Sequence, residues 1–126
     1  MTAEKQKIVV LGGGFAGLET AFLVNHRLHD QVSITIVSDE PDFLFRPNTI
    51  YVPFGLDPDE LRIPLNGPTT KQGIDFVHAR VEDVDPGQRL VRLAGRDPMP
   101  YDKLVIGTGA SMRPSEVPGL EEYANT

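Results

Sequence analysis

The sequence contains no cysteine, and this absence excludes several kinds of chemistry. Without a thiol the chain forms no disulfide, binds no zinc or iron–sulfur cluster through sulfur, and has no thiol nucleophile. Histidine is scarce as well, with three residues. His26 and His29 are three residues apart on a predicted helix, but no third ligand is near them in the sequence. We therefore expect exposed histidines and no metal site.

Basic residues and long apolar runs are also lacking. Twelve Lys and Arg against eighteen Asp and Glu give a formal net charge of −6, which argues against a nucleic-acid partner because clustered cations are needed to neutralise phosphates. Near the N-terminus only residues 8–11 are apolar before glycines interrupt. A secretory signal needs roughly seven to fifteen such residues and a spanning helix roughly twenty. We expect a soluble, cytoplasmic chain.

Strand and helix patterns alternate in the first third of the chain. Residues 7–11 form an apolar run typical of a buried strand, residues 15–28 have apolar side chains at helical spacing, and residues 32–37 form a second apolar run. The apolar stripe of the helix comprises Leu18, Ala21, Phe22 and Leu28. Strand, helix and strand within roughly thirty residues predict a right-handed βαβ unit with parallel strands.

The rest of the chain is less regular. Two prolines favour a packed loop over residues 42–55, and we expect its aromatic residues Phe43, Phe45 and Phe54 in the core. The other predicted elements are an N-capped turn over 57–61, a strand over 74–78, a hairpin of 81–84 and 90–93, and a strand over 101–106. The pattern leaves open whether His78 is an interior histidine or lies near a ligand.

The predicted elements give an α/β fold, a Rossmann-type parallel sheet with an antiparallel β-hairpin as crossover. A parallel sheet usually has helices on both faces, and none is predicted after the last strand. This favours a fragment. Residues 1–110 would form the N-terminal part of a Rossmann-type domain, and residues 111–126, with two prolines and a glycine, would form an extended exit linker.

Gly12, Gly14 and Gly17 form the pattern G-x-G-x-x-G between the first predicted strand and the helix. In this setting the first glycine permits a tight turn, the second permits backbone approach to a pyrophosphate, and the third permits close helix–strand packing. Free N–H groups at the helix start, around Phe15 and Ala16, would face the phosphates. The alternative is a glycine-rich turn without a ligand, but the βαβ setting favours dinucleotide binding.

The second strand ends in Ser38, Asp39 and Glu40, at the sheet edge where the glycine loop also lies. An acid at this point can hydrogen-bond two ribose hydroxyls and would repel a 2′-phosphate. The separation from Gly12 exceeds the usual spacing of about twenty residues, so the identity of the ribose partner stays open. Asp39 is the first choice and Ser38 the second, and solvated loop acids are the alternative.

Three segments resemble the FAD domain of flavoproteins of the pyridine nucleotide-disulfide oxidoreductase superfamily: residues 12–17, 34–39 and 43–48. Residues 45–55, Phe-Arg-Pro-Asn through Val-Pro-Phe-Gly, are most similar to the N-terminal FAD-binding part of sulfide:quinone oxidoreductase. Residues 101–110, a predicted strand followed by Gly-Thr-Gly-Ala, are similar to the superfamily's second FAD motif. The resemblance covers essentially the whole chain.

The resemblance implies roles for further residues around an FAD. Thr108 and Gly109 would approach the diphosphate, and Arg80 or Val81 would contact adenine through the backbone. Arg46 and Pro47 would lie near the isoalloxazine. The hairpin around residues 86–87 matches the β-meander of these domains.

The resemblance also implies an FAD-dependent oxidoreductase that passes electrons from a small-molecule donor through FAD to a quinone-type acceptor. The alternatives are a type II NADH:quinone or ferredoxin-reductase-like flavoenzyme, a non-catalytic dinucleotide-binding module, and an NAD-only dehydrogenase. An NAD-only enzyme is disfavoured because no Tyr-x-x-x-Lys pair is present.

The chain departs from the superfamily in ways that also favour an incomplete FAD-binding domain. The dithiol pair of glutathione-reductase-like members is excluded, and the cysteines that sulfide oxidation needs come after position 126 in the family. The second nucleotide-binding domain and the late Gly-Asp strand are missing too. We expect the chain alone to be inactive and identify no catalytic residue in it. Membrane contact in a full-length protein, peripheral in kind, would use C-terminal segments absent here.

Overall fold

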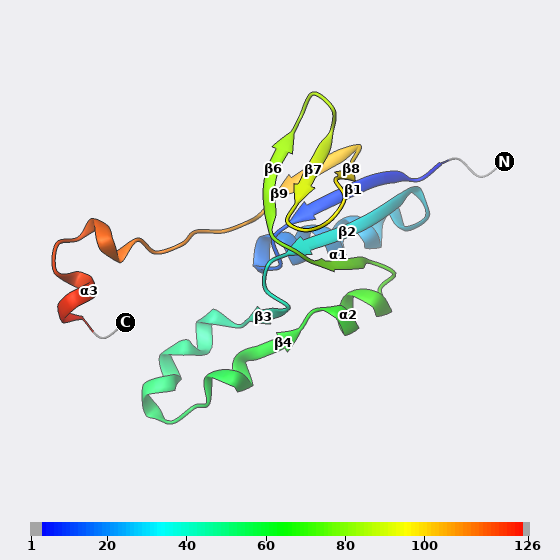
Figure 1. Cartoon of the computed structure of the whole chain (residues 1–126). Coiled ribbons are helices and arrows are strands. Elements are labelled where there is room, and N and C mark those ends of the chain that lie inside the picture. Colours follow the sequence, from blue (N-terminus) through cyan, green and yellow to red (C-terminus); the bar gives the residue numbers. More distant parts are fainter. Residues whose placement is uncertain (1–3, 125–126) are drawn as a thin grey trace.

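The computed structural model describes residues 4–124, and its centre is a four-stranded parallel sheet (Figure 1). Its strands, in the spatial order β5-β2-β1-β9, are β5 Asp75–His78, β2 Val32–Ser38, β1 Gln6–Leu11 and β9 Lys103–Ile106. The predicted α/β fold with a Rossmann-type parallel sheet is confirmed. Because the two central strands are apolar and β-branched along most of their length, they are buried on both faces.

The helix of the predicted βαβ unit covers one face of this sheet. Helix α1, Phe15–Leu28, has the bounds that its sequence pattern predicts and is followed by the short 3₁₀ turn η1, His29–Gln31. Its residues Leu18, Ala21 and Phe22 pack against a core that includes Val10 and Ile36. Leu28 does not join the stripe, since it is 39% exposed at the end of the helix.

An antiparallel meander, rather than a helix, covers the other face (Figure 1). Its strands are β6 Val81–Asp85, β7 Leu90–Leu93 and β8 Met99–Pro100, so the predicted hairpin is confirmed and gains a third strand. Val91 and Leu93 of β7 pack with Val9 and Val37 of the sheet. Helices on both faces are therefore not required here, and the last parallel strand begins two residues later than predicted.

Residues 42–64 form a projecting arm, and the packed loop predicted for residues 42–55 is part of it (Figure 1). Strand β3, Asp42–Leu44, pairs antiparallel with β4, Arg62–Pro64, and the 3₁₀ helices η2, Arg46–Phe54, and η3, Pro58–Leu61, lie between them. The expected cap of η3 is confirmed, because the Asp57 carboxylate accepts the Asp59 N–H at 3.0 Å. Helix α2, Asn66–Lys71, then returns the chain to β5.

The arm changes the environment of its aromatic residues. Phe54 was expected in the core, and this is wrong, since it is 86% exposed at the end of η2. A two-stranded ribbon that leaves the main sheet provides no second layer against which such a side chain could pack. Phe43 and Phe45, near the base of the arm, are half-buried.

The segment after β9 leaves the sheet and turns twice, at the 3₁₀ turn η4, Pro114–Glu116, and the short helix α3, Leu120–Tyr123 (Figure 1). The predicted extended segment is thus only partly extended, and its last two residues, 125–126, lie outside the described range. Across residues 4–124 no helix has both the length and the apolar character that crossing a membrane demands.

Candidate functional site

Parallel strands bring the loops that follow them to one edge of the sheet, and most predicted site residues lie there. Leu11 pairs with Val37 of β2 and with Ile106 of β9, and Ser38 pairs with His78 of β5, so the four strands end together. Strand ends, the loops after them and the starts of the next elements at this carboxyl edge contain Gly12, Gly14, Phe15, Ala16, Gly17, Ser38, Asp39, Val81, Thr108 and Gly109. Ligands of open α/β sheets bind at such an edge.

The glycine loop is fixed between β1, α1 and β9 by close backbone contacts. Gly12 has a φ of +104°, and a Cβ at this position would collide with the carbonyl oxygen of Gly107. A Cβ at Gly17 would collide in the same way with the carbonyl oxygen of Gly12. Two backbone hydrogen bonds of 2.8 Å, from Gly12 N–H to the Val37 carbonyl and from Gly107 N–H to the Leu11 carbonyl, hold this junction.

Two glycines that the motif does not require also shape the loop. A Cβ on Gly13 would lie 2.6 Å from Cδ1 of Leu65 and 3.2 Å from Oγ of Ser38. Gly107 lies against Gly17, with 3.2 Å between its Cβ position and the Gly17 nitrogen. Sequence reasoning missed both roles, although the run of three glycines and the Gly-Thr-Gly strand end were visible signals.

The start of α1 has backbone N–H groups without an intrahelical partner. The first intrahelical bond runs from Leu18 N–H to the Gly14 carbonyl at 3.0 Å, so the N–H groups between these residues have no intrahelical partner. Gly14 is the N-cap, receives no side-chain cap in the described structure, and no acid occupies the first turn. A Cβ on Gly14 would meet no atom within 4 Å. Such a helix start suits a phosphate.

The loop after β2 separates the two candidate ribose partners. Ser38 is buried, and its Oγ accepts the Glu40 N–H at 3.2 Å, whereas Asp39 is exposed. His78, whose role the sequence leaves open, is exposed and not an interior histidine. Its Nε2 lies 2.8 Å from the carbonyl oxygen of Asp39.

Arg46 and Pro47 lie on the arm, at the exposed first turn of η2. The preceding rings connect the arm to the start of α1, since the ring of Phe15 lies 4.9 Å from that of Phe43 and 5.9 Å from that of Phe45. Beside this cluster, residues of the first half of α1 and Phe43 line a mostly apolar hollow of about 400 Å³. The arm therefore begins next to the glycine loop.

Val81 and Thr108 are held near the edge by different neighbours. Val81 is half-buried and pairs with Leu93, and the adjacent Arg80 carbonyl accepts the Ala94 N–H at 2.9 Å. The Cα of Thr108 is 3.1 Å from the Cβ position of Gly12. Gly109 has a φ of +72° and is exposed.

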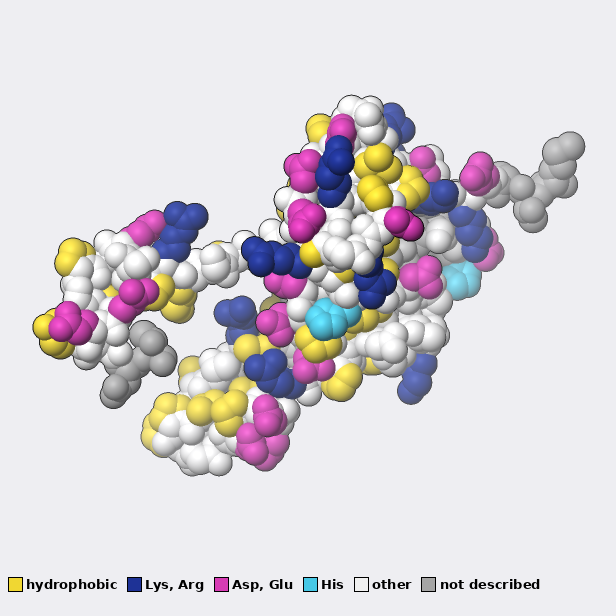
Figure 2. Space-filling model, viewed as in Figure 1, with side chains coloured by type: hydrophobic (Ala, Val, Ile, Leu, Met, Phe, Trp, Pro, Cys, Tyr) yellow, Lys and Arg dark blue, Asp and Glu magenta, His cyan; other side chains and the backbone are white. Residues whose placement is uncertain are grey.

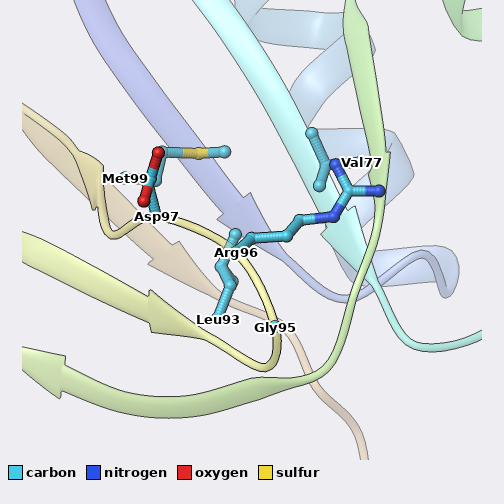
Figure 3. Close-up of a pocket in the computed structure, with 6 residues that line it drawn as sticks. All are labelled: Val77, Leu93, Gly95, Arg96, Asp97 and Met99. Carbon is cyan, nitrogen blue, oxygen red and sulfur yellow. The ribbon is translucent and has the colours of Figure 1, made fainter.

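A second hollow, of about 720 Å³, lies between the end of β5 and the meander (Figure 3). Its lining is Val77, Leu93, Gly95, Arg96, Asp97 and Met99, and Figure 3 shows the Arg96 side chain reaching toward Val77. None of the predicted site residues lines this hollow. Acidic and basic side chains alternate over the visible surface without a single-sign patch (Figure 2).

Together, a parallel sheet, a glycine loop fixed at its carboxyl edge and a meander crossover define a Rossmann-type dinucleotide-binding domain of the flavoprotein kind. The chain belongs to the pyridine nucleotide-disulphide oxidoreductase family, whose sequence profile matches residues 6–126. Members of this family are oxidoreductases.

Individual relatives point to two branches of this family. A sulfide-quinone reductase of Aquifex aeolicus is 32% identical over 106 residues, which are 83% of this chain and 24% of that protein. An NADH dehydrogenase-like protein of Mycobacterium tuberculosis is 30% identical over 123 residues, 93% of this chain and 30% of that protein.

A solved structure agrees with the first of these branches. The sulfide:quinone oxidoreductase of Aquifex aeolicus matches with a TM-score of 0.85 and 32% identity, covering 93% of this chain and 27% of that one. The chain therefore spans less than a third of the length of these relatives.

Proposed function

We propose that the chain binds FAD along the carboxyl edge of its sheet and is the FAD-binding part of an oxidoreductase similar to sulfide:quinone oxidoreductase. The observation that carries this proposal is the uncapped start of α1, together with the open space around the Cβ position of its N-cap, Gly14. Phosphates of a dinucleotide fit this space because the N–H groups and the helix dipole both attract negative charge. The family membership makes FAD the first choice of dinucleotide.

In this proposal each part of the edge has a separate task. Backbone N–H groups from Gly14 to Gly17 bind the diphosphate, with Thr108 and Gly109 approaching it from β9. Asp39 binds the adenosine ribose, and the backbone at Val81 lies toward adenine. Arg46 and Pro47 approach the isoalloxazine from the arm. Bound FAD would supply two-electron transfer, and the residues of this chain bind and orient it.

The proposed electron acceptor is a quinone, as the names of the sulfide-quinone relatives suggest. The donor would be sulfide or another small molecule, and cysteines for sulfide oxidation would have to come from residues outside this chain, which has none. The second candidate is a type II NADH:quinone-like enzyme, favoured by the NADH dehydrogenase-like relative.

Residues 1–110 would be the FAD domain, and residues 111–126 a linker to a further domain. Peripheral contact with a membrane would be made by other segments.

The first experiment is a titration of the purified chain with FAD and, separately, with NADH. We expect FAD to bind with quenched flavin fluorescence and NADH to give little response. A clear preference for NADH would contradict the proposal and favour an NAD-only dehydrogenase.

Gly14→Ala should weaken FAD binding, because its methyl group enters the proposed phosphate space. His29→Leu, at an exposed position, serves as the matched control.

A further inference from the structure

Two side chains hold one peptide unit just after β2. The carbonyl oxygen of Asp39 lies 2.8 Å from Nε2 of His78, and the N–H of Glu40 lies 3.2 Å from Oγ of Ser38. This C=O and this N–H belong to the same peptide, so both of its polar ends are bound by side chains. Because a peptide unit is planar, holding both ends restricts rotation of the whole unit.

The hydrogen-bond roles follow from the groups involved. A carbonyl oxygen accepts and never donates, so this contact requires the tautomer in which the Nε2–H of His78 donates a hydrogen bond to the carbonyl oxygen of Asp39. His78 is the last residue of β5 and pairs with Ser38, and Ala79 N–H donates to the Ser38 carbonyl at 2.9 Å. The imidazole thus adds one more bond beyond the last main-chain bond between β2 and β5.

From this geometry we propose that His78 is a positioning residue that orients the Asp39 carboxylate toward the ribose of the bound dinucleotide. The proposal rests on the proposed function, in which Asp39 binds that ribose. Ser38 supports the same peptide from its other end. Its buried hydroxyl accepts the Glu40 N–H, so Ser38 holds the end of the peptide opposite to His78.

The orientation of this peptide affects binding because a ribose hydroxyl donates a charge-assisted hydrogen bond to the carboxylate, and the strength of that bond depends on direction. The β2 ladder fixes the backbone before Asp39, and the two side chains fix it afterwards, so the Cα–Cβ bond of Asp39 points one way. Loss of the His78 bond leaves the peptide after Asp39 held only at its N–H, by Ser38. The ribose-dependent part of the affinity should then fall, while the contribution of the phosphates stays.

The test compares ADP with 2′-deoxy-ADP by calorimetry, because these probes differ by one ribose hydroxyl and share the diphosphate. We expect the unsubstituted chain to prefer ADP by about tenfold or more. His78→Leu should bind ADP about threefold to tenfold more weakly and should discriminate little between the two nucleotides. His78→Gln, whose side-chain amide also donates, should restore the preference, and His29→Leu is the matched control.

A ligand-free measurement examines the held peptide itself. Amide hydrogen exchange at Glu40 should be faster in His78→Leu than in the unsubstituted chain and unchanged in His29→Leu. An unchanged rate at Glu40 would overturn the proposed role of His78.

The binding outcomes separate the two proposals. If His78→Leu loses equal affinity for both nucleotides, or keeps the preference for ADP, the positioning role is overturned while FAD binding stands. If the unsubstituted chain binds neither FAD nor ADP, the proposed function fails, and the positioning role fails with it.

Discussion

At the scale of single residues, the three motif glycines of the loop have two different environments. Gly12 and Gly17 are required by packing, because a Cβ at either position would collide with a carbonyl oxygen. Gly14 has a negative φ and faces open space, so nothing in the protein itself demands a glycine there. Gly12 and Gly17 thus shape the loop, and Gly14 leaves the open space in which we propose that the phosphates bind.

This difference predicts that alanine substitutions at Gly17 and Gly14 change the free energy of unfolding by different amounts. Gly17→Ala should lower the free energy of unfolding by about 1–3 kcal/mol, since a collision with backbone outweighs the gain of about 1 kcal/mol that alanine gives inside a helix. Gly14→Ala should change that free energy by no more than about 0.5 kcal/mol. Urea titration measures both. Equal stability of Gly17→Ala and the original chain would contradict the steric role of Gly17.

At the scale of elements, an aromatic cluster connects the arm to α1. The ring of Phe43 lies 4.9 Å from that of Phe15 and 6.4 Å from that of Phe45, and the Phe45 N–H donates to the Leu61 carbonyl at 2.9 Å. The arm is otherwise a short two-stranded ribbon, which has little stability alone. The cluster therefore decides how firmly Arg46 and Pro47 are held beside the glycine loop.

Phe43→Ala should loosen the arm without unfolding the sheet. Each ring pair contributes about 0.5–1.5 kcal/mol beyond burial, so amide exchange at Phe45 should become about tenfold faster, with β1 and β2 unchanged. Hydrogen exchange followed by NMR measures this change. Phe54→Ala is the control, because that ring is 86% exposed and has no ring partner within residues 4–124. Similar acceleration in both variants would argue against the cluster.

At the scale of the whole molecule, two cores share one sheet. The core under α1 includes Ile36, and the core under the meander includes Val91, both fully buried. Residues of β1 alternate between the two, with Val10 in the first and Val9 in the second. Because the same strands supply both cores, the two layers should unfold together.

Ile36→Ala, on the α1 side, should lower the free energy of unfolding by about 2–5 kcal/mol, and Val91→Ala, on the meander side, should also lower it. In both variants, urea unfolding should stay a single transition that coincides by far-UV circular dichroism and tyrosine fluorescence. Separate transitions for the two probes in Val91→Ala would show that the meander unfolds independently of the sheet.

Local sequence patterns predicted much of this fold. The bounds of α1, the parallel strands on either side of it, the glycine loop and the β6–β7 hairpin all follow from apolar spacing and turn residues. The prediction for residues 42–55 was wrong because aromatic residues and prolines in a run indicate packing but not the surface that provides it. Phe54 shows this, since its exposure depends on an arm that leaves the sheet.

The sequence by itself thus determined the class of the domain and the glycine loop between β1 and α1, because helix and strand periods and glycine spacing are properties of neighbouring residues. Only the tertiary structure decided that Gly107 meets Gly12, that His78 bonds to Asp39, and that a meander replaces a covering helix. Each of these contacts joins residues distant in the chain. They depend on strand order and register, which packing of the two cores sets and no local pattern specifies.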